Sequence, residues 1–200
     1  MTMHYLPGDL RRIAVIGCSG SGKSTLSRLL GGVTGLPVIH LDREHWQPGW
    51  TEPPRDAWAA RVAALAERPE WIIDGQYGAQ LRDRLIRADL AIFLDLPTPI
   101  CLSRVVRRTI GGHGRVRPDM GEGCPERFDL EFLRYVASFR RRQRPNILRL
   151  LDETGVRTVW LRLRREQASF IRALQGSGLT AALRSAPRWP QPIGFSSTTI

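Results

Sequence analysis

The sequence predicts an α/β fold with three layers, in which a five-stranded, mostly parallel sheet lies between helices. Short apolar runs rich in β-branched residues alternate with longer stretches whose apolar residues recur at helical spacing. No segment is repeated. The first apolar run leads through a glycine-rich turn into an amphipathic stretch, which is the order of strand, loop and helix in a parallel α/β sheet.

Five short apolar runs are expected to form the strands, because each is rich in Ile, Val or Leu and lies between turn-forming or charged residues. They cover residues 12–16, 36–42, 70–75, 90–97 and 156–163. In such sheets ligands bind beyond the carboxyl ends of the strands. The loops that follow the first four strands should therefore share one crevice.

Helices are expected between the strands, where apolar residues repeat every three or four positions. They cover about 24–30, 55–67, 79–87, 98–110, 129–143, 146–153 and 165–174. Gly31 and Gly32 should end the first helix. We expect one domain over residues 1–175 and a loosely ordered tail over 176–200, because no periodic pattern is sustained in the tail.

The chain has 200 residues, with 30 Lys and Arg against 19 Asp and Glu, and a net charge of +11. Such an excess attracts phosphate groups and suggests contact with nucleic acid. Lys23 is the one lysine, and this near-total use of arginine is typical of a coding bias that raises arginine on any solvated surface. The charge therefore leaves nucleic-acid binding open.

The three cysteines, Cys18, Cys101 and Cys124, are too few and too widely spaced for a disulfide framework or a zinc-ligand set. The first residues, MTMHYLPGDLRR, lack the basic and apolar regions of a secretory signal, and no apolar run reaches the length of a membrane span. We therefore expect a cytoplasmic protein without a membrane-spanning segment.

The segment GCSGSGKST contains the motif G-x-x-x-x-G-K-[ST] between an apolar strand and a helix. Glycines let successive backbone N–H groups face one anion, and the helix adds its own unpaired N–H groups. A flexible lysine reaches the β- and γ-phosphates where a rigid arginine would not, which explains why Lys23 persists. The residues expected to bind ATP are Gly17, Cys18, Ser19, Gly20, Ser21, Gly22, Lys23, Ser24 and Thr25.

Two carboxylates at strand ends are candidates for chemistry beside ATP. Asp74 follows the third apolar run and can hold Mg²⁺ through water, so the expected metal ligands are Ser24 and Asp74. A turn or helix-cap role is the alternative for Asp74. Asp95 follows the fourth run close to Pro97, where a turn role competes equally with a catalytic one.

Asp42, at the end of the second run, should face the phosphoryl acceptor and orient or deprotonate its hydroxyl group. Metal coordination and a structural role are the alternatives. Trp46 and Trp50 could stack on a ring-shaped acceptor. The residues expected to bind the acceptor are Asp42, Trp46, Asp74, Gly75 and Tyr77.

Residues 104–128, rich in glycine, proline and arginine, are expected to form a mobile lid. Cations that close over the γ-phosphoryl group would stabilise its developing charge. The candidates are Arg108, Arg115 and Arg117, which complete a predicted catalytic set with Lys23 and Asp42. The alternative is a solvated basic face.

Several stretches together resemble the adenylate-kinase-related P-loop NTPases known as DNA topology modulation proteins: GCSGSGKST, HLDREHWQPGW, WIIDGQY, FLDLP, RPDMGEGCPE and a helix ending in FRRRQRP. The similarity runs from about Arg12 to Leu174. It implies a nucleoside- or nucleotide-kinase-like fold with ATP on the glycine-rich loop and a lid above it, but no particular acceptor. Gln76-Tyr77-Gly78 stands where adenylate kinases have Phe-Pro-Arg, so their usual nucleoside-monophosphate contact is missing.

These features favour an ATP-dependent small-molecule phosphotransferase that uses ATP and Mg²⁺. The acceptor would be a nucleoside, a nucleotide or another compound that bears a hydroxyl or phosphate group. Two alternatives stay open. One is an ATP-binding regulatory protein that contacts nucleic acid through its basic surface, and the other is an NTPase that hydrolyses ATP without an acceptor.

Overall fold

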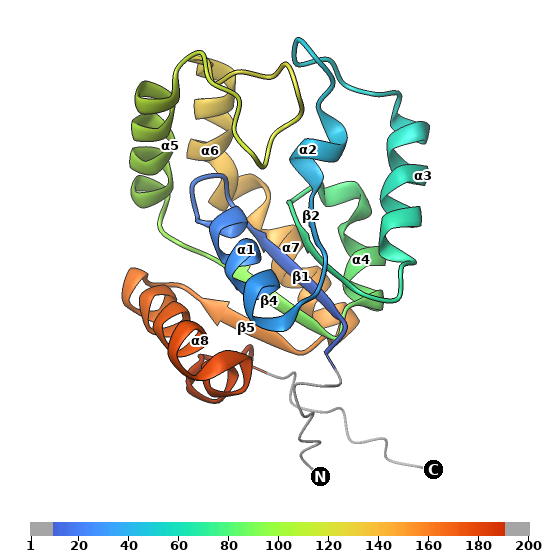
Figure 1. Ribbon diagram of the computed structural model, residues 1–200, viewed down its shortest axis with the longest axis vertical. Helices are drawn as coiled ribbons and strands as arrows, with labels where there is room; N and C mark the ends of the chain where they lie inside the picture. Colours follow the sequence, from blue (N-terminus) through green and yellow to red (C-terminus); the bar gives the residue numbers. More distant parts are fainter. Residues whose placement is uncertain (1–9, 191–200) are drawn as a thin grey trace.

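A computed structural model describes residues 10–190 of the chain (Figure 1). Its centre is a five-stranded sheet with the strand order β2-β3-β1-β4-β5, and every strand pair is parallel. The strands are β1 (Arg12–Gly17), β2 (Val38–His40), β3 (Trp71–Asp74), β4 (Leu90–Leu94) and β5 (Thr158–Leu161). The expected parallel α/β fold is therefore confirmed, with all five strands in the predicted segments.

Helices cover both faces of the sheet. One face carries α1 (Lys23–Thr34) and α8 (Arg164–Ser185), which pack against each other. The other face carries α3 (Arg55–Ala66), α4 (Leu81–Arg87) and α7 (Arg144–Thr154). The remaining helices are α2 (Leu41–His45), the short 3₁₀ turn Gly78–Gln80, α5 (Thr98–Gly112) and α6 (Leu130–Arg142).

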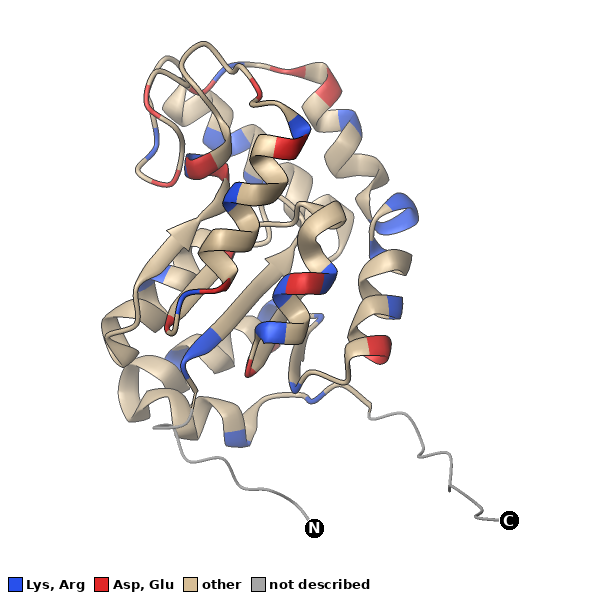
Figure 2. Ribbon diagram, turned by 90° about the vertical axis from the view of Figure 1, so that its right-hand side faces the viewer, with Lys and Arg blue, Asp and Glu red and all other residues tan. Residues whose placement is uncertain are grey.

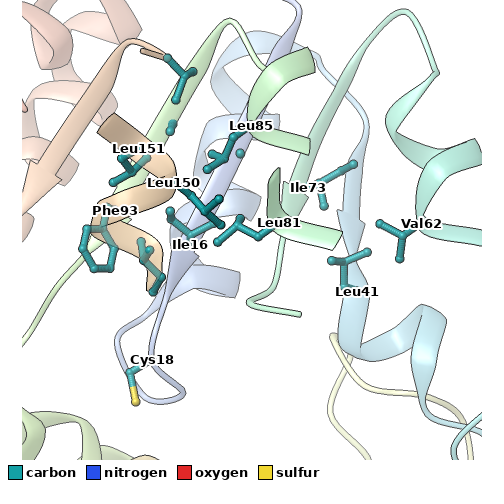
Figure 3. Packing of buried hydrophobic residues seen from close by; sticks show 14 of the residues in the cluster. Ile16, Cys18, Leu41, Val62, Ile73, Leu81, Leu85, Phe93, Leu150 and Leu151 are labelled. Carbon is teal, nitrogen blue, oxygen red and sulfur yellow. The ribbon is translucent and has the colours of Figure 1, made fainter. Parts of the chain in front are cut away.

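Successive residues of each central strand enter two separate apolar cores, because side chains alternate across a sheet. On β1, Ile13 and Val15 face α1 and α8, whereas Ile16 faces the opposite layer. Figure 3 shows Ile16 and Phe93 among side chains of α4 and α7 in this second core. Both central strands are thus buried on both faces, and their carboxyl ends, beside Gly17 and Asp95, carry the loops of the site.

The first helix extends beyond the predicted stop at Gly31 and Gly32. It ends at Thr34, and Gly35 caps it with a φ of 75°. Gly31 instead allows a close approach to the sheet, because a Cβ atom there would lie 2.5 Å from Cγ2 of Val38. Gly31 is therefore explained by packing and not by helix termination, whereas a Cβ atom at Gly32 would meet no atom within 4 Å.

The last helix also continues beyond the predicted boundary at residue 175. Gly178, with a φ of 78° and a ψ of −177°, is not helical and divides α8 into two helical parts. Leu179, Ala182 and Leu183 then resume the apolar spacing and are buried against the sheet. The expectation of a loose tail is therefore wrong for residues 176–190, and residues 191–200 lie outside the described part of the chain.

Replacing Leu183 by Ala should lower the free energy of unfolding by about 2–5 kcal/mol, because the change leaves a cavity at a side chain that is only 5% exposed. Urea denaturation measures the loss. Leu130→Ala, at a position that is 51% exposed, serves as the control and should change stability by less than about 0.5 kcal/mol. Equal, small effects of the two changes would contradict the packing of α8 after Gly178.

No helix within residues 10–190 combines the length and the apolar character needed to cross a bilayer.

Candidate active site

The glycine-rich loop between β1 and α1 is shaped for close approach of backbone to a ligand. Gly17, Gly20 and Gly22 all have positive φ angles, of 143°, 79° and 98°. A Cβ atom would lie 2.5 Å from the carbonyl oxygen of Leu94 at Gly17, and 2.4 Å from that of Cys101 at Gly20. Only glycine fits these positions without displacing backbone. The loop is therefore a preformed cradle of the kind that phosphates occupy.

Lys23 begins α1 and folds back over this loop. Its Nζ donates a hydrogen bond of 3.1 Å to the carbonyl oxygen of Cys18. Ser24 and Thr25 follow in the first turn of the helix, where N–H groups are unpaired. The side chains of Cys18 and Ser21 point into the protein and are buried. Of the six predicted nucleotide contacts that have a side chain, these two could reach a ligand only through their backbone.

A cavity of about 270 Å³ opens beside the loop and is strongly basic. The charged residues around it are Lys23, Arg28, Arg104, Arg108, Arg117 and Asp119. Five cations against one carboxylate attract a polyanion. Asp119 lies beside the hydroxyl of Ser24. Burial alone would raise the pKa of Asp119, but Arg117 and this hydroxyl hold it below its usual value.

Two side chains fix the loop from outside. Arg104 donates to the carbonyl oxygens of Gly20 and Ser21, at 3.3 and 3.2 Å, and Gln167 donates to that of Ser21 at 2.8 Å. Arg104 begins the predicted lid, but these bonds make it a support of the phosphate cradle. Gln167, on α8, was not predicted, because its partner is 146 residues away and no local pattern connects them.

The lid residues Arg108 and Arg117 converge on one buried carboxylate, Glu126. The ion pairs from their Nε atoms to Oε1 of Glu126 measure 3.0 and 2.5 Å. The pKa of Arg108 is lowered, mainly because the side chain is buried and also because the positive charge of Arg117 is close. Arg115, by contrast, is exposed and lines neither this cavity nor the next. The structure thus brings two of the three predicted lid arginines to the site and leaves Arg115 outside it.

A second cavity, of about 480 Å³, adjoins the first, and Arg108 and Arg117 line both. Its walls include Trp46, Trp50 and Tyr77. Asp42 also lines it, in the first turn of α2 and not at the end of a strand as predicted, because β2 ends at His40. The hydroxyl of Tyr77 donates to Oδ1 of Asp42 at 3.0 Å, which leaves the second carboxylate oxygen available.

The lid covers the second cavity by contact with the loop after α2. Gly49 N–H donates to the carbonyl oxygen of Gly123 at 3.1 Å, and Trp50 Nε1 donates to that of Pro125 at 3.2 Å. Cys124 Sγ donates to the carbonyl oxygen of Gln47 at 3.0 Å. In Figure 1 the segment between α5 and α6 accordingly reaches down toward α2. The contacts describe a lid in a closed position.

Asp74 is buried at the end of β3 and lines neither cavity. It accepts a hydrogen bond of 2.9 Å from Nδ1 of His40 on the neighbouring strand. Burial alone would lower the pKa of His40, but this bond and the charge of Asp74 raise it. Within residues 10–190 no three His, Cys, Asp or Glu side chains form a metal-binding cluster. A cation at Ser24 would therefore depend on the phosphates for most of its ligands.

The backbone of residues 75–77, which follows β3 and borders the second cavity, is held by Arg84. This side chain is fully buried and donates to the carbonyl oxygens of Gly75 and Gln76, at 2.9 and 2.6 Å. Burial lowers the pKa of Arg84 to about 10, so the guanidinium stays charged near neutral pH. A Cβ atom at Gly75 would lie 2.8 Å from Cβ of Leu41, so Gly75 serves the close packing of this turn and contacts no cavity.

Many other arginines also have partners inside the protein. Arg144 donates to both oxygens of Asp95, which is buried and also accepts from Trp160 Nε1. Asp95 is therefore structural. Figure 2 shows acidic residues interspersed with basic ones on the helices of one side of the molecule. The sequence's net charge of +11 thus includes many arginines that the fold itself uses.

Several solved structures resemble this one. They include the shikimate kinase from Bacteroides thetaiotaomicron (TM-score 0.50, 17% identity, covering 83% of this chain and 96% of that one). A shikimate kinase from Acinetobacter baumannii in complex with shikimate has a TM-score of 0.49 and 19% identity, and the match covers 84% of this chain and 93% of that one. A gluconokinase from Sinorhizobium meliloti 1021 has a TM-score of 0.48 and 21% identity, and the match covers 87% of this chain and 92% of that one. No protein-family model and no curated protein matches the sequence.

At these identities the likeness shows the fold alone. The Bacteroides structure and this chain share the α/β P-loop fold, which is the class of fold that the sequence motifs imply.

Proposed function

We propose that the chain is an ATP-dependent phosphotransferase that transfers the γ-phosphoryl group of ATP to a hydroxyl group of a small molecule. The observation that carries the proposal is the pair of adjoining cavities. One is basic and lies on the phosphate cradle, the other has aromatic walls and a free carboxylate oxygen, and Arg108 and Arg117 line both. The similar fold of the shikimate kinase from Bacteroides thetaiotaomicron supports the same class of reaction.

In this reaction the acceptor oxygen attacks the γ-phosphorus, and the bond from that phosphorus to the β–γ bridging oxygen breaks. Asp42 would take the proton of the acceptor hydroxyl. Tyr77 orients Asp42, and burial, together with Asp42, raises the pKa of Tyr77, so the phenol stays protonated and continues to donate. Arg108 and Arg117, between the cavities, would stabilise the charge of the group in transfer.

The residues also fit Mg²⁺ bound with the nucleotide. Ser24 lines the basic cavity, and Asp119 lies beside its hydroxyl. We propose that Ser24 holds the ion directly, with Asp119 as the carboxylate nearby. Asp74, the other predicted ligand, is buried beside His40 and lines neither cavity, so the geometry does not support its predicted role through water. When bound, Mg²⁺ neutralises charge on the β- and γ-phosphates. We also propose that the chain is related to the DNA topology modulation proteins, and the motifs quoted from the sequence support this relationship.

An ATP-consumption assay with Mg²⁺ over nucleosides, sugars, aminocyclitols and nucleotides tests the proposal. We expect at least one acceptor to raise ADP formation above the acceptor-free rate and to yield a phosphorylated product. Turnover that no acceptor changes would favour a simple NTPase instead. Binding to DNA with a steep salt dependence would favour the nucleic-acid alternative, which stays a prediction.

Glu126→Gln should lower kcat by about 10- to 100-fold, because it releases the two guanidiniums that Glu126 positions between the cavities. The KM for ATP should change much less, since the cradle and Lys23 stay intact. Steady-state kinetics with the acceptor found above measure both constants. Glu122→Gln, an exposed change on the same loop, is the control and should behave as wild type. A rise in KM for ATP with an unchanged kcat would contradict this role of Glu126.

A further inference from the structure

The two adjoining cavities have opposite charge. The cavity on the phosphate cradle has five cationic side chains and one carboxylate. The second cavity has five carboxylates and three guanidiniums, from Asp42, Glu52, Glu126, Asp129, Glu131, Arg108, Arg117 and Arg127. The chain has a net charge of +11, so its composition would not lead one to expect a cavity with more acidic than basic side chains.

Protein partners already compensate some of these charges. Glu126 is paired with Arg108 and Arg117. Asp129 caps α6 and lies 3.8 Å from Arg127, whose guanidinium lies over the ring of Trp50, 5.2 Å from its centroid. The carboxylates that remain are Asp42, Glu52 and Glu131.

Within residues 10–190 none of these three carboxylates forms an ion pair. Asp42 is half-buried, whereas Glu52 and Glu131 are exposed, so water screens part of their charge. The acidic excess still favours a cationic ligand over an anionic one at this cavity.

The walls of the same cavity are rich in aromatic side chains. Trp46, Trp50, Tyr77, Phe132 and Tyr135 line it. The ring centroids of Trp46 and Trp50 are 5.4 Å apart, and those of Phe132 and Tyr135 are 6.3 Å apart. Aromatic faces attract ammonium groups through their quadrupoles, and the gain increases when the site excludes water.

From these observations we infer that the acceptor is a small hydroxyl compound that carries an ammonium group and no anionic group. The inference rests on the phosphotransferase proposed above and names the acceptor class for its second cavity. The volume of about 480 Å³ lies within the range of small-molecule sites. Among the acceptors considered above, this inference excludes nucleotides and other phosphate-bearing compounds.

The test compares acceptors of similar size in which one group is cationic, neutral or anionic. Two matched sets serve: ethanolamine, ethylene glycol and glycolate, and glucosamine, glucose and glucuronate. Calorimetric titration into the full-length protein, with a non-hydrolysable ATP analogue and Mg²⁺ present, measures their binding. We expect the ammonium member of at least one set to bind about tenfold tighter than its neutral counterpart, and the carboxylate member to bind weakest. The inference is wrong if a neutral or anionic member binds as tightly, or if no ammonium member binds.

Two variants separate charge from folding. Glu52→Gln combined with Glu131→Gln should reduce the preference for the ammonium member to about threefold or less, with binding of the neutral member unchanged. Glu67→Gln, an exposed change at the end of α3, should keep the full preference. An undiminished preference in the double variant would overturn the role of these carboxylates.

ADP formation with the same compounds distinguishes the two proposals. If glucose or glucuronate is phosphorylated faster than glucosamine, the phosphotransferase stands and the acceptor class is wrong. If ammonium compounds bind preferentially but never yield ADP, the charge preference stands and the phosphotransferase is wrong.

Discussion

Replacing Lys23 by Met should reduce kcat by roughly 10²- to 10³-fold, the loss expected when one preorganised charge is removed from a transferring phosphoryl group. The side chain begins α1 and bridges the cradle through its bond to the Cys18 carbonyl oxygen, so its Nζ lies where the phosphates of ATP would bind. Met keeps the length and apolar stem of lysine. Steady-state rates of ADP formation, with circular dichroism to confirm folding, measure the effect.

Lys23→Arg separates charge from geometry at the same position. Lys23 is the one lysine among 30 Lys and Arg residues, so this change puts at position 23 the residue that the chain uses everywhere else for a permanent positive charge. The planar guanidinium cannot reproduce the reach of a single ammonium group over the loop. We expect Lys23→Arg to lose at least about tenfold in kcat, because the hydrogen bond to Cys18 and the phosphate contact both require a compact donor. Wild-type activity in this variant would contradict the explanation for the single lysine.

Asp42→Asn should lower kcat by about 10²- to 10⁴-fold, because it removes the proposed base without changing the shape of the side chain. The Tyr77 hydroxyl can still donate to the side-chain oxygen at position 42, so the local structure should persist. Binding of ATP should be unchanged, since Asp42 lines only the second cavity. Single-turnover transfer to the acceptor, measured beside ATP affinity, separates these two effects.

Tyr77→Phe is the companion change, because it removes the hydrogen bond to Asp42 and leaves the carboxylate. If Tyr77 only positions Asp42, Tyr77→Phe should lower kcat by about tenfold, which is less than the loss expected for Asp42→Asn. If Asp42→Asn keeps wild-type kcat while Tyr77→Phe does not, Asp42 cannot be the base, and its place beside the cavity would be structural.

Local patterns were sufficient to predict most of the fold. The five apolar runs, the glycine-rich turn after the first and the alternation with helices identify the parallel sheet, because strands buried on both faces have a continuous apolar sequence. Two boundaries failed. Gly31 was expected to end the first helix, but its missing side chain lets the helix pack closely against Val38. The tail after residue 175 was expected because the apolar spacing is interrupted there, but the chain resumes a helix after Gly178 and packs on the sheet.

The part of the site that a contiguous motif forms, the cradle at Gly17–Ser24, could be predicted from the sequence. The parts that depend on contacts between residues far apart in the sequence could not be predicted. Glu126 gathers Arg108 and Arg117, and Arg84 holds the turn at 75–77. Glu126 ends the stretch RPDMGEGCPE, but that stretch does not show which cations it pairs with, and Arg84 belongs to none of the motifs. Only the fold brings each to its partners. Arg115 matched the composition of a lid but lies exposed, because composition does not determine which way a loop residue points.

The most direct test of the central claim follows the γ-phosphoryl group itself. Wild-type protein and Lys23→Met would be incubated with ATP labelled at the γ-phosphate, Mg²⁺ and the two matched acceptor sets. We predict that the label moves to the hydroxyl oxygen of an ammonium-bearing acceptor in the wild-type reaction, and that Lys23→Met forms at most about one hundredth of this product. Label that appears only as inorganic phosphate, whatever the acceptor, would contradict the account of the chain as a phosphotransferase.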